Sequence, residues 1–385
     1  MAKLLSIVVP TKDRYKYLFH LIELIKSFDS DQIEMVIQDN NYDNSPIQSY
    51  FETHKDHDFI KYAHTKEQIP VSLNSDLAIR NSSGEYVCFI GDDDGVTSYV
   101  LDCAQWMKDN DIEAVVPDSV SYDWPDFISV GEELKSRLSH KEFTGKALAK
   151  EPAEMLRDLM KKGLINRGNL PLVYHGIVKR SVLNKIDEIC GSYFPGPSPD
   201  IANGVALSLV VKRYVNISLP IVISGGSATH GGGIRKLKNH VADIDSIPFL
   251  PADAKKMWEP NIPKVWTGET VWPESAIKAM RKMGRSDLID QINFDYMYAW
   301  FSAYHFGIRS MAFKFCRNKI KVTTLMFYFI VCRYFNFIRR VVWSKLFNKR
   351  YGYKTYRGIQ NIQEAATILH TESGILLKRF FHENN

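Results

Sequence analysis

The sequence predicts an α/β protein with a mostly parallel sheet flanked by helices, followed by a helical C-terminal extension. Three observations predict it. Across residues 1–120, short apolar runs alternate with segments of helical periodicity. Acidic residues recur where the predicted strands end. Beyond residue 290 the chain becomes rich in aromatic and basic residues.

The N-terminal part alternates between the two kinds of element. The predicted strands are Leu4–Pro10, Ile33–Asp39, Phe59–Ala63, Tyr86–Gly91 and Ala114–Pro117. Between them we expect helices at Tyr15–Phe28, from about Pro46, at Val71–Arg80 and at Tyr99–Asp109. Strands that alternate with helices indicate βαβ units, and hence a parallel sheet that binds ligands at the carboxyl ends of its strands.

The pattern is weaker further along the chain. We expect a strand at 173–178, a helix at Ile201–Val211, a strand at Ile217–Ile223 and then a glycine-rich loop, 224–233. These features divide the chain into an α/β domain, 1–235, a connecting segment, 236–290, and a helical C-terminal region, 291–385.

Composition excludes several classes of protein. The 385 residues carry a net charge of only +5, which is too small to indicate nucleic-acid binding. Neither GxGxxG nor GxxxxGK[ST] follows a predicted strand, and the five cysteines form no CxxC pair. The first residues form no signal peptide, and no apolar run reaches the roughly 18 residues of a spanning helix. We therefore expect a cytoplasmic protein.

Acidic residues at the predicted strand ends are the first sign of function. Asp13, Asp39 and the run Asp92–Asp94 all follow strands. Three adjacent carboxylates repel one another, and a divalent Mg²⁺ or Mn²⁺ ion would offset that repulsion. Each feature also has an ordinary structural interpretation, because Asp92–Asp94 can form a solvated turn and Asp39 can cap a helix or an Asx-turn.

The same motifs, in order, resemble those of family-2 glycosyltransferases of the GT-A fold. They are Ser6-Ile-Val-Val-Pro-Thr-Lys-Asp-Arg, then Val36-Ile-Gln-Asp-Asn, then Asn74, then Gly84-Glu-Tyr-Val-Cys-Phe-Ile-Gly-Asp-Asp-Asp. The resemblance covers about residues 4–100. Gly91 stands where the family's acidic motif usually has its first Asp, which leaves the register of that motif open.

The resemblance implies a nucleotide-sugar site at these positions. Asp39 would hold the base, and a divalent metal (Mn²⁺ or Mg²⁺) would be held by Asp93 and Asp94. The full set of residues implied to contact the nucleotide sugar is Pro10, Thr11, Asp13, Arg14, Asp39, Asn74, Arg80, Asp92 and Asp93.

Two further residues complete the expected site. Inverting transfer needs a general base beside the acceptor hydroxyl, and Asp200, in Ser198-Pro-Asp, opens a predicted helix where the family commonly places that base. Pro199 replaces the family's usual acidic neighbour, and a helix-capping role for Asp200 is the alternative. His230, in the glycine-rich loop, is a candidate metal ligand or phosphate contact.

The C-terminal region combines aromatic and basic residues, including Phe327, Tyr334, Phe335, Arg333 and Arg340. This composition is typical of an interfacial helix on an anionic membrane surface, and the alternatives are a helix packed on the catalytic domain or a dimer interface.

Taken together, the sequence predicts an inverting hexosyl- or N-acetylhexosaminyl-transferase. It would use a nucleotide sugar, with UDP as the favoured nucleotide, and a polyprenyl-linked or growing glycan acceptor. The setting would be assembly of a bacterial surface polysaccharide, O-antigen or capsule, on the inner face of the cell membrane. The alternatives are a sugar nucleotidyltransferase of similar fold and a catalytically degenerate relative that binds glycan or membrane.

Overall fold

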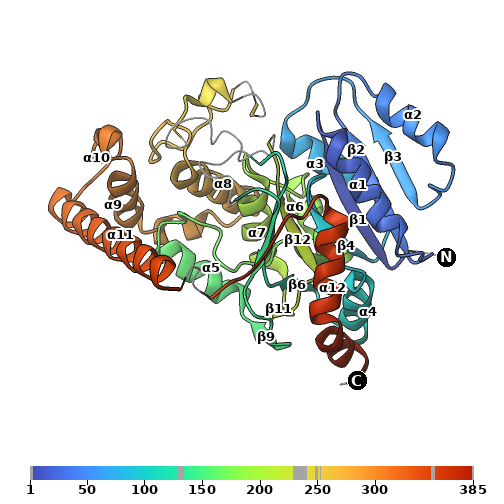
Figure 1. Ribbon diagram of the computed structural model, residues 1–385. Helices are drawn as coiled ribbons and strands as arrows, with labels where there is room; N and C mark the ends of the chain where they lie inside the picture. Colours follow the sequence, from blue (N-terminus) through green and yellow to red (C-terminus); the bar gives the residue numbers. More distant parts are fainter. Residues whose placement is uncertain are drawn as a thin grey trace.

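The computed structural model describes residues 3–127, 134–228, 241–247, 250–251, 253–347 and 352–383. Its centre is an eight-stranded sheet with the order β3-β2-β1-β4-β10-β6-β11-β9 (Figure 1). Six strands run parallel, and β10 and β9 run antiparallel to their neighbours. Their bounds are β1 Leu5–Thr11, β2 Ile33–Asp39, β3 Ile60–His64, β4 Tyr86–Phe89, β6 Ala114–Pro117, β9 Ala147–Lys150, β10 Ile177–Lys179 and β11 Tyr214–Ile217.

Helices cover both faces of this sheet. Alternate residues of β1 point to opposite faces, so Ile7 and Val9 join one apolar core while Val8 joins another. The first core is formed with α1 (Tyr15–Lys26), α4 (Val100–Asp109) and α12 (Ile362–Lys378). The second is formed with α3 (Val71–Arg80), α6 (Arg180–Cys190) and α7 (Pro199–Val210), while α2 (Ser45–Thr53) lies beside β3. The predicted βαβ arrangement of the N-terminal part is confirmed, with several bounds differing by one or two residues.

A second, five-stranded sheet has the order β13-β8-β7-β12-β5. Its strands are β5 Gly95–Val96, β7 Val120–Asp123, β8 Arg137–His140, β12 Val222–Gly226 and β13 Lys354–Arg357. The prediction of one strand at Ile217–Ile223 is wrong. The segment is divided between β11 in the first sheet and β12 in the second, because Pro220 between them has no N–H to donate to a ladder.

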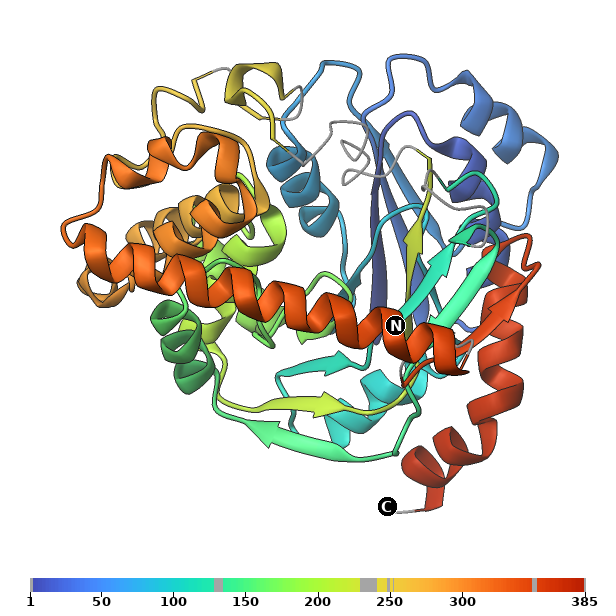
Figure 2. The ribbon, with the colours of Figure 1, turned by 60° about the vertical axis from the view of Figure 1, so that its left-hand side comes forward.

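Helices form a second lobe beside the sheets. They are α5 (Pro152–Lys161), α8 (Gly268–Lys282), α9 (Phe294–Tyr304), α10 (Ser310–Phe313) and α11 (Lys319–Phe347). Phe329 of α11 packs edge-on against Tyr296 and Trp300 of α9, and Figure 2 shows α11 crossing this side of the molecule as one long rod. Among the helices in the described ranges, none is long and apolar enough to cross a membrane.

The region predicted as one C-terminal extension, 291–385, has two parts in the structure. Helices α9 to α11 belong to the helical lobe, whereas β13 adds to the second sheet and α12 packs against α1 and β5. Ile362 and Leu369 of α12 are fully buried in the same core as α1. Helix α12 is therefore part of the core that covers one face of the main sheet.

We predict that Leu369→Ala lowers the free energy of unfolding by about 2–5 kcal/mol, because it leaves a cavity in the core shared with β1. Urea titration followed by circular dichroism measures it. Ile375→Ala on the same helix is the control, since that side chain is 88% exposed and its loss should change stability by less than about 0.5 kcal/mol. Equal effects of the two substitutions would contradict the docking of α12.

Candidate active site

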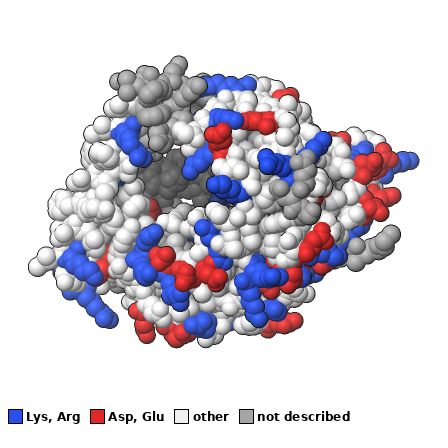
Figure 3. Space-filling view, turned by 90° about the horizontal axis from the view of Figure 1, so that it is seen from below, with Lys and Arg blue, Asp and Glu red and all other residues white. Residues whose placement is uncertain are grey.

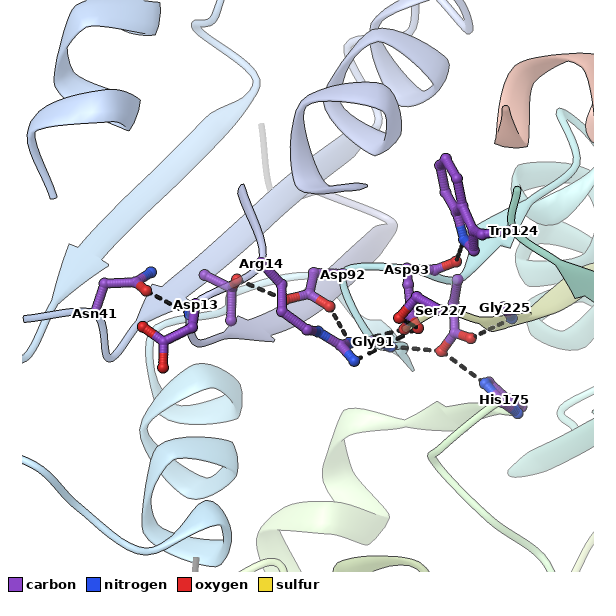
Figure 4. Close-up of polar contacts among 12 residues, drawn as sticks. Asp13, Arg14, Asn41, Gly91, Asp92, Asp93, Trp124, His175, Gly225 and Ser227 are labelled. Atoms are coloured by element: carbon purple, nitrogen blue, oxygen red, sulfur yellow. Dashed lines mark hydrogen bonds and ion pairs between the residues drawn. The ribbon is translucent and has the colours of Figure 1, made fainter. Parts of the chain in front are cut away.

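The acidic run lies in a tight loop between β4 and β5, at the carboxyl edge of the main sheet (Figure 4). Asp92, Asp93 and Asp94 are 1%, 3% and 1% exposed, so the interpretation as a solvated turn is wrong. Trp124 Nε1 donates to the carbonyl oxygen of Asp93 at 2.8 Å. A Cβ at Gly225 would lie 1.8 Å from that oxygen, so only glycine permits β12 to pass this close.

Arg14 supplies positive charge between the first two carboxylates. Its Nη2 forms ion pairs with Asp92 and, at 2.7 Å, with Asp93. Burial would lower the pKa of Arg14, but Asp92 and Asp93 together raise it, so the guanidinium stays charged. Burial raises the pKa of Asp93 to about 7, against the opposing effect of Arg14. Two hydroxyls complete the set, Thr11 Oγ1 donating to Asp92 and Ser227 Oγ to Asp93, each at 2.6 Å.

The third carboxylate has a different environment. A 2.7 Å hydrogen bond joins Asp94 Oδ2 to His175 Nε2, and the backbone amides of Gly91 and Gly225 donate to Asp94 at 2.6 and 2.7 Å. Burial would raise the pKa of Asp94, but His175 and these amides outweigh it and lower the pKa. His175 adopts a left-handed backbone conformation, φ 61°, which costs energy in a non-glycine residue and is typical of functional sites.

The carboxylates have the right chemistry for a divalent cation, since hard ions take oxygen ligands. In this structure each of their six oxygens already accepts a hydrogen bond from the protein. Within the described ranges no group of three His, Cys, Asp or Glu side chains is arranged to hold an ion. The Arg14 side chain lies between Asp92 and Asp93, whereas Asp94 is fixed by two backbone amides.

Asp39 lies at the end of a strand, as the sequence predicts, but its carboxylate already accepts hydrogen bonds from the protein. It is fully buried at the end of β2, paired in register with Thr11. It accepts hydrogen bonds from the hydroxyls of Tyr15 and Tyr62 and from both nitrogens of Asn41. Four donors use the acceptor capacity of a carboxylate, so a base could bind here only by displacing one of them.

Asn74 and Arg80 lie at opposite ends of α3. Asn74 is in the first turn, near the carboxyl edge, and its buried Oδ1 has no hydrogen-bond partner among the described residues. Arg80 is at the far end, where it forms a bidentate pair with Asp187 and lies over the Tyr193 ring. A helix that returns antiparallel to its strands carries its last residues away from the ligand edge. The structure therefore does not support the predicted contact between Arg80 and the nucleotide.

The structure places three of the remaining predicted residues, Pro10, Asp13 and Asp200. Pro10 is half-buried at the end of β1. Asp13, shortly after that strand, is exposed and adopts a left-handed backbone conformation with φ 59°. Asp200 is half-buried in the first turn of α7, and its pKa is raised by burial and by Asp94, against the opposing effects of Arg167 and His175. Asp200 thus lies within electrostatic reach of the acidic loop. His230 falls outside the described residues.

Three contributors were not assigned to the acidic loop from the sequence. They are His175, Trp124 and Ser227, none of which lies in a motif that the sequence analysis used. The glycine-rich stretch after Ile223 was a usable signal, because glycines permit the close approach of β12 to the loop.

Part of the chain is similar in sequence to known glycosyltransferases. Residues 6–155 match the model of glycosyl transferase family 2. The GalNAc(5)-diNAcBac-PP-undecaprenol beta-1,3-glucosyltransferase of Campylobacter jejuni is 30% identical over 158 residues, 40% of this chain and 47% of that protein. The chain thus spans about half the length of this curated relative.

Two solved structures are similar at low sequence identity. S. aureus TarS 1-349 in complex with UDP-GlcNAc is 14% identical, with a TM-score of 0.49, covering 84% of this chain and 91% of that one. The mannosyltransferase PcManGT from Pyrobaculum calidifontis, in complex with GDP-Man and Mn²⁺, is 15% identical, with a TM-score of 0.37 and coverage of 85% and 88%.

We predict that Arg14→Gln lowers the free energy of unfolding by about 3–5 kcal/mol, because Asp92 and Asp93 remain buried without their counter-charge. Millimolar Mn²⁺ should restore part of the loss in this variant and change the wild type less. Denaturant titration with and without Mn²⁺ measures both effects. Arg285→Gln, which breaks an exposed pair with Asp287, should cost at most about 1 kcal/mol. A variant as stable as the wild type would refute the role of Arg14.

Proposed function

We propose that the protein is an inverting glycosyltransferase that moves a sugar from a UDP-sugar to a lipid-linked glycan, in assembly of a bacterial surface polysaccharide such as O-antigen or capsule. The observation that carries the proposal is the buried, charge-compensated acidic loop at the carboxyl edge of the sheet, with Asp200 of another element in electrostatic reach. The family match supports the transferase activity, and the acceptor named for the Campylobacter relative supports the acceptor class.

The donor would lie along the carboxyl edge from β2 to β4. The buried Oδ1 of Asn74 has no hydrogen-bond partner among the described residues, and this side chain would contact the nucleotide beside Pro10. Arg14 would turn from the carboxylates toward the diphosphate, since guanidinium groups pair well with phosphate oxygens. A Mn²⁺ or Mg²⁺ ion, when bound, would stabilise charge on the leaving diphosphate. Asp92 and Asp93 would bind this ion. The sequence analysis expected Asp94 as the second ligand, but Asp94 already accepts hydrogen bonds from two backbone amides.

Asp200 would act as the general base. Its raised pKa makes the carboxylate a better proton acceptor than an ordinary aspartate. As the acceptor oxygen bonds to the anomeric carbon, the bond from that carbon to the nucleoside diphosphate breaks. The hydroxyl proton passes to Asp200. The transition state is oxocarbenium-like, as in other glycosyl chemistry.

Calorimetric titration with UDP, with and without Mn²⁺, tests the donor site. We expect UDP binding that strengthens with Mn²⁺, and Asp93→Asn should weaken it at least tenfold. Asp200→Asn should keep the affinity for UDP but lower the rate of transfer by roughly 10²-fold or more, because only the proton acceptor is lost. Asp290→Asn, at an exposed position, serves as control. If UDP fails to bind with or without Mn²⁺, the UDP assignment is withdrawn.

We further propose that α11 rests on the membrane surface. Its exposed face carries an apolar stripe that recurs at helical spacing, within roughly 100° of the helix circumference. The stripe consists of Ile320, Phe327, Val331, Tyr334, Phe335, Ile338 and Val342. Arg333 instead lies over the ring of Tyr304 of α9, so it is on the packed side. Residues 339–350 contain Arg339, Arg340, Lys345, Lys349 and Arg350 and no acidic residue, which complements anionic lipid headgroups.

We predict that the protein floats with vesicles that contain phosphatidylglycerol and not with neutral phosphatidylcholine vesicles. Phe335→Glu with Ile338→Glu should abolish flotation, because it places charge in the apolar stripe, whose two side chains are 67% and 56% exposed. Ile375→Glu on α12 is the matched control. If the stripe is a dimer interface instead, the double variant will change the molecular mass in solution and the wild type will not float.

A further inference from the structure

We infer that a cavity beside the acidic loop binds an anionic group of the acceptor; this rests on the proposed transferase function and deepens it. The cavity has a volume of about 480 Å³. It is bordered by the β6–β7 connection, β9, β11 and residues 167–175. Figure 3 shows that the molecule is hollowed on the side seen from below, with Lys and Arg side chains around the opening.

The charge of the lining is strongly one-sided. Lys141, Lys150 and Arg167 line the cavity, and Asp118 is the acidic residue among the lining side chains. In the described part of the chain, none of the three cations forms an ion pair with a carboxylate, whereas Asp118 accepts a hydrogen bond from Ser218. The lining thus carries three cations against one carboxylate, and an excess of positive charge in a concave site attracts an anionic ligand.

The cavity reaches the reacting groups through two lining residues. His175 lines it and is bonded to Asp94 of the acidic loop. Arg167 lines it and acts electrostatically on Asp200, the proposed base. A molecule seated in the cavity therefore extends toward the position where the acceptor hydroxyl must meet Asp200.

The position in the sheet favours the acceptor over the donor. The proposed nucleotide site lies at β1 and β2, whereas the cavity lies at β6, β11 and β9, on the other side of β4. The remaining lining includes the polar side chains of Asn169 and Asn216, and the Lys141 ammonium lies over the ring of Tyr353, which holds that cation at the cavity.

Two sources could supply the anion. One is the diphosphate that joins a lipid carrier to its glycan, and the other is a carboxylate on an acidic sugar. Both present oxygen anions that Lys and Arg bind by charge-assisted hydrogen bonds. The arms of the experiment separate them.

The test is calorimetric titration of the full-length protein, saturated with UDP, with inorganic pyrophosphate, with glucuronate and with neutral methyl glucoside. We expect an anion to bind in the presence of UDP, and Lys141→Gln with Lys150→Gln to weaken that binding roughly tenfold or more, as expected for lost charged hydrogen bonds. Lys185→Gln with Lys256→Gln, two exposed positions outside the cavity, removes the same charge and should leave the affinity unchanged. Preference for pyrophosphate assigns a diphosphate acceptor, and preference for glucuronate assigns an acidic sugar.

Three results would overturn the inference. Anion binding that UDP abolishes would place the anion at the donor site. Equal affinity in the Lys141/Lys150 variant and the wild type would remove the cavity from the binding site. If UDP does not bind but pyrophosphate binding still depends on Lys141 and Lys150, the acceptor role fails together with the UDP assignment, and that result differs from failure of the cavity itself.

Discussion

The structure depends on the burial of three consecutive carboxylates at the carboxyl edge of a parallel sheet. A buried charge is tolerated only when it is paired and hydrogen-bonded. Here the compensation comes from segments far apart in the sequence: Arg14 after β1, His175 before β10, and Gly225 and Ser227 at the end of β12. The acidic loop can therefore take its shape only when these strands have assembled, which couples the formation of the site to the formation of the fold.

The C-terminal segment contributes to the same assembly. Trp124, which holds the loop through the Asp93 carbonyl oxygen, belongs to the apolar core that contains Ile362 and Leu369 of α12. Strand β13 closes the edge of the sheet that carries β7 and β12. Residues 354–378 thus belong to the same core and the same sheet as the strands that hold the acidic loop.

The sequence predicts well the bounds of helices and strands, which depend on local pattern. It does not predict the hydrogen bonds of a side chain whose partners lie far along the chain. The strand Ile33–Asp39 and the helix Val71–Arg80 have the predicted bounds, because apolar periodicity is a local property. The saturation of Asp39 could not be predicted, since two of its donors, Tyr15 and Tyr62, come from other elements. Arg80 was placed in the site by the family resemblance, but it lies at the end of α3 that is far from Asn74.

The proposed membrane helix and the proposed acceptor cavity are linked by the chain itself. Tyr353, at the cavity, is six residues beyond Phe347, the end of α11. Six residues span at most roughly 20 Å, so the cavity must lie within that distance of the helix end. The diphosphate of a lipid-linked glycan sits at the bilayer surface, directly after its hydrocarbon. If both proposals hold, the basic cavity would lie close enough to the bilayer to take such a diphosphate, with the attached glycan extending past His175 toward Asp200.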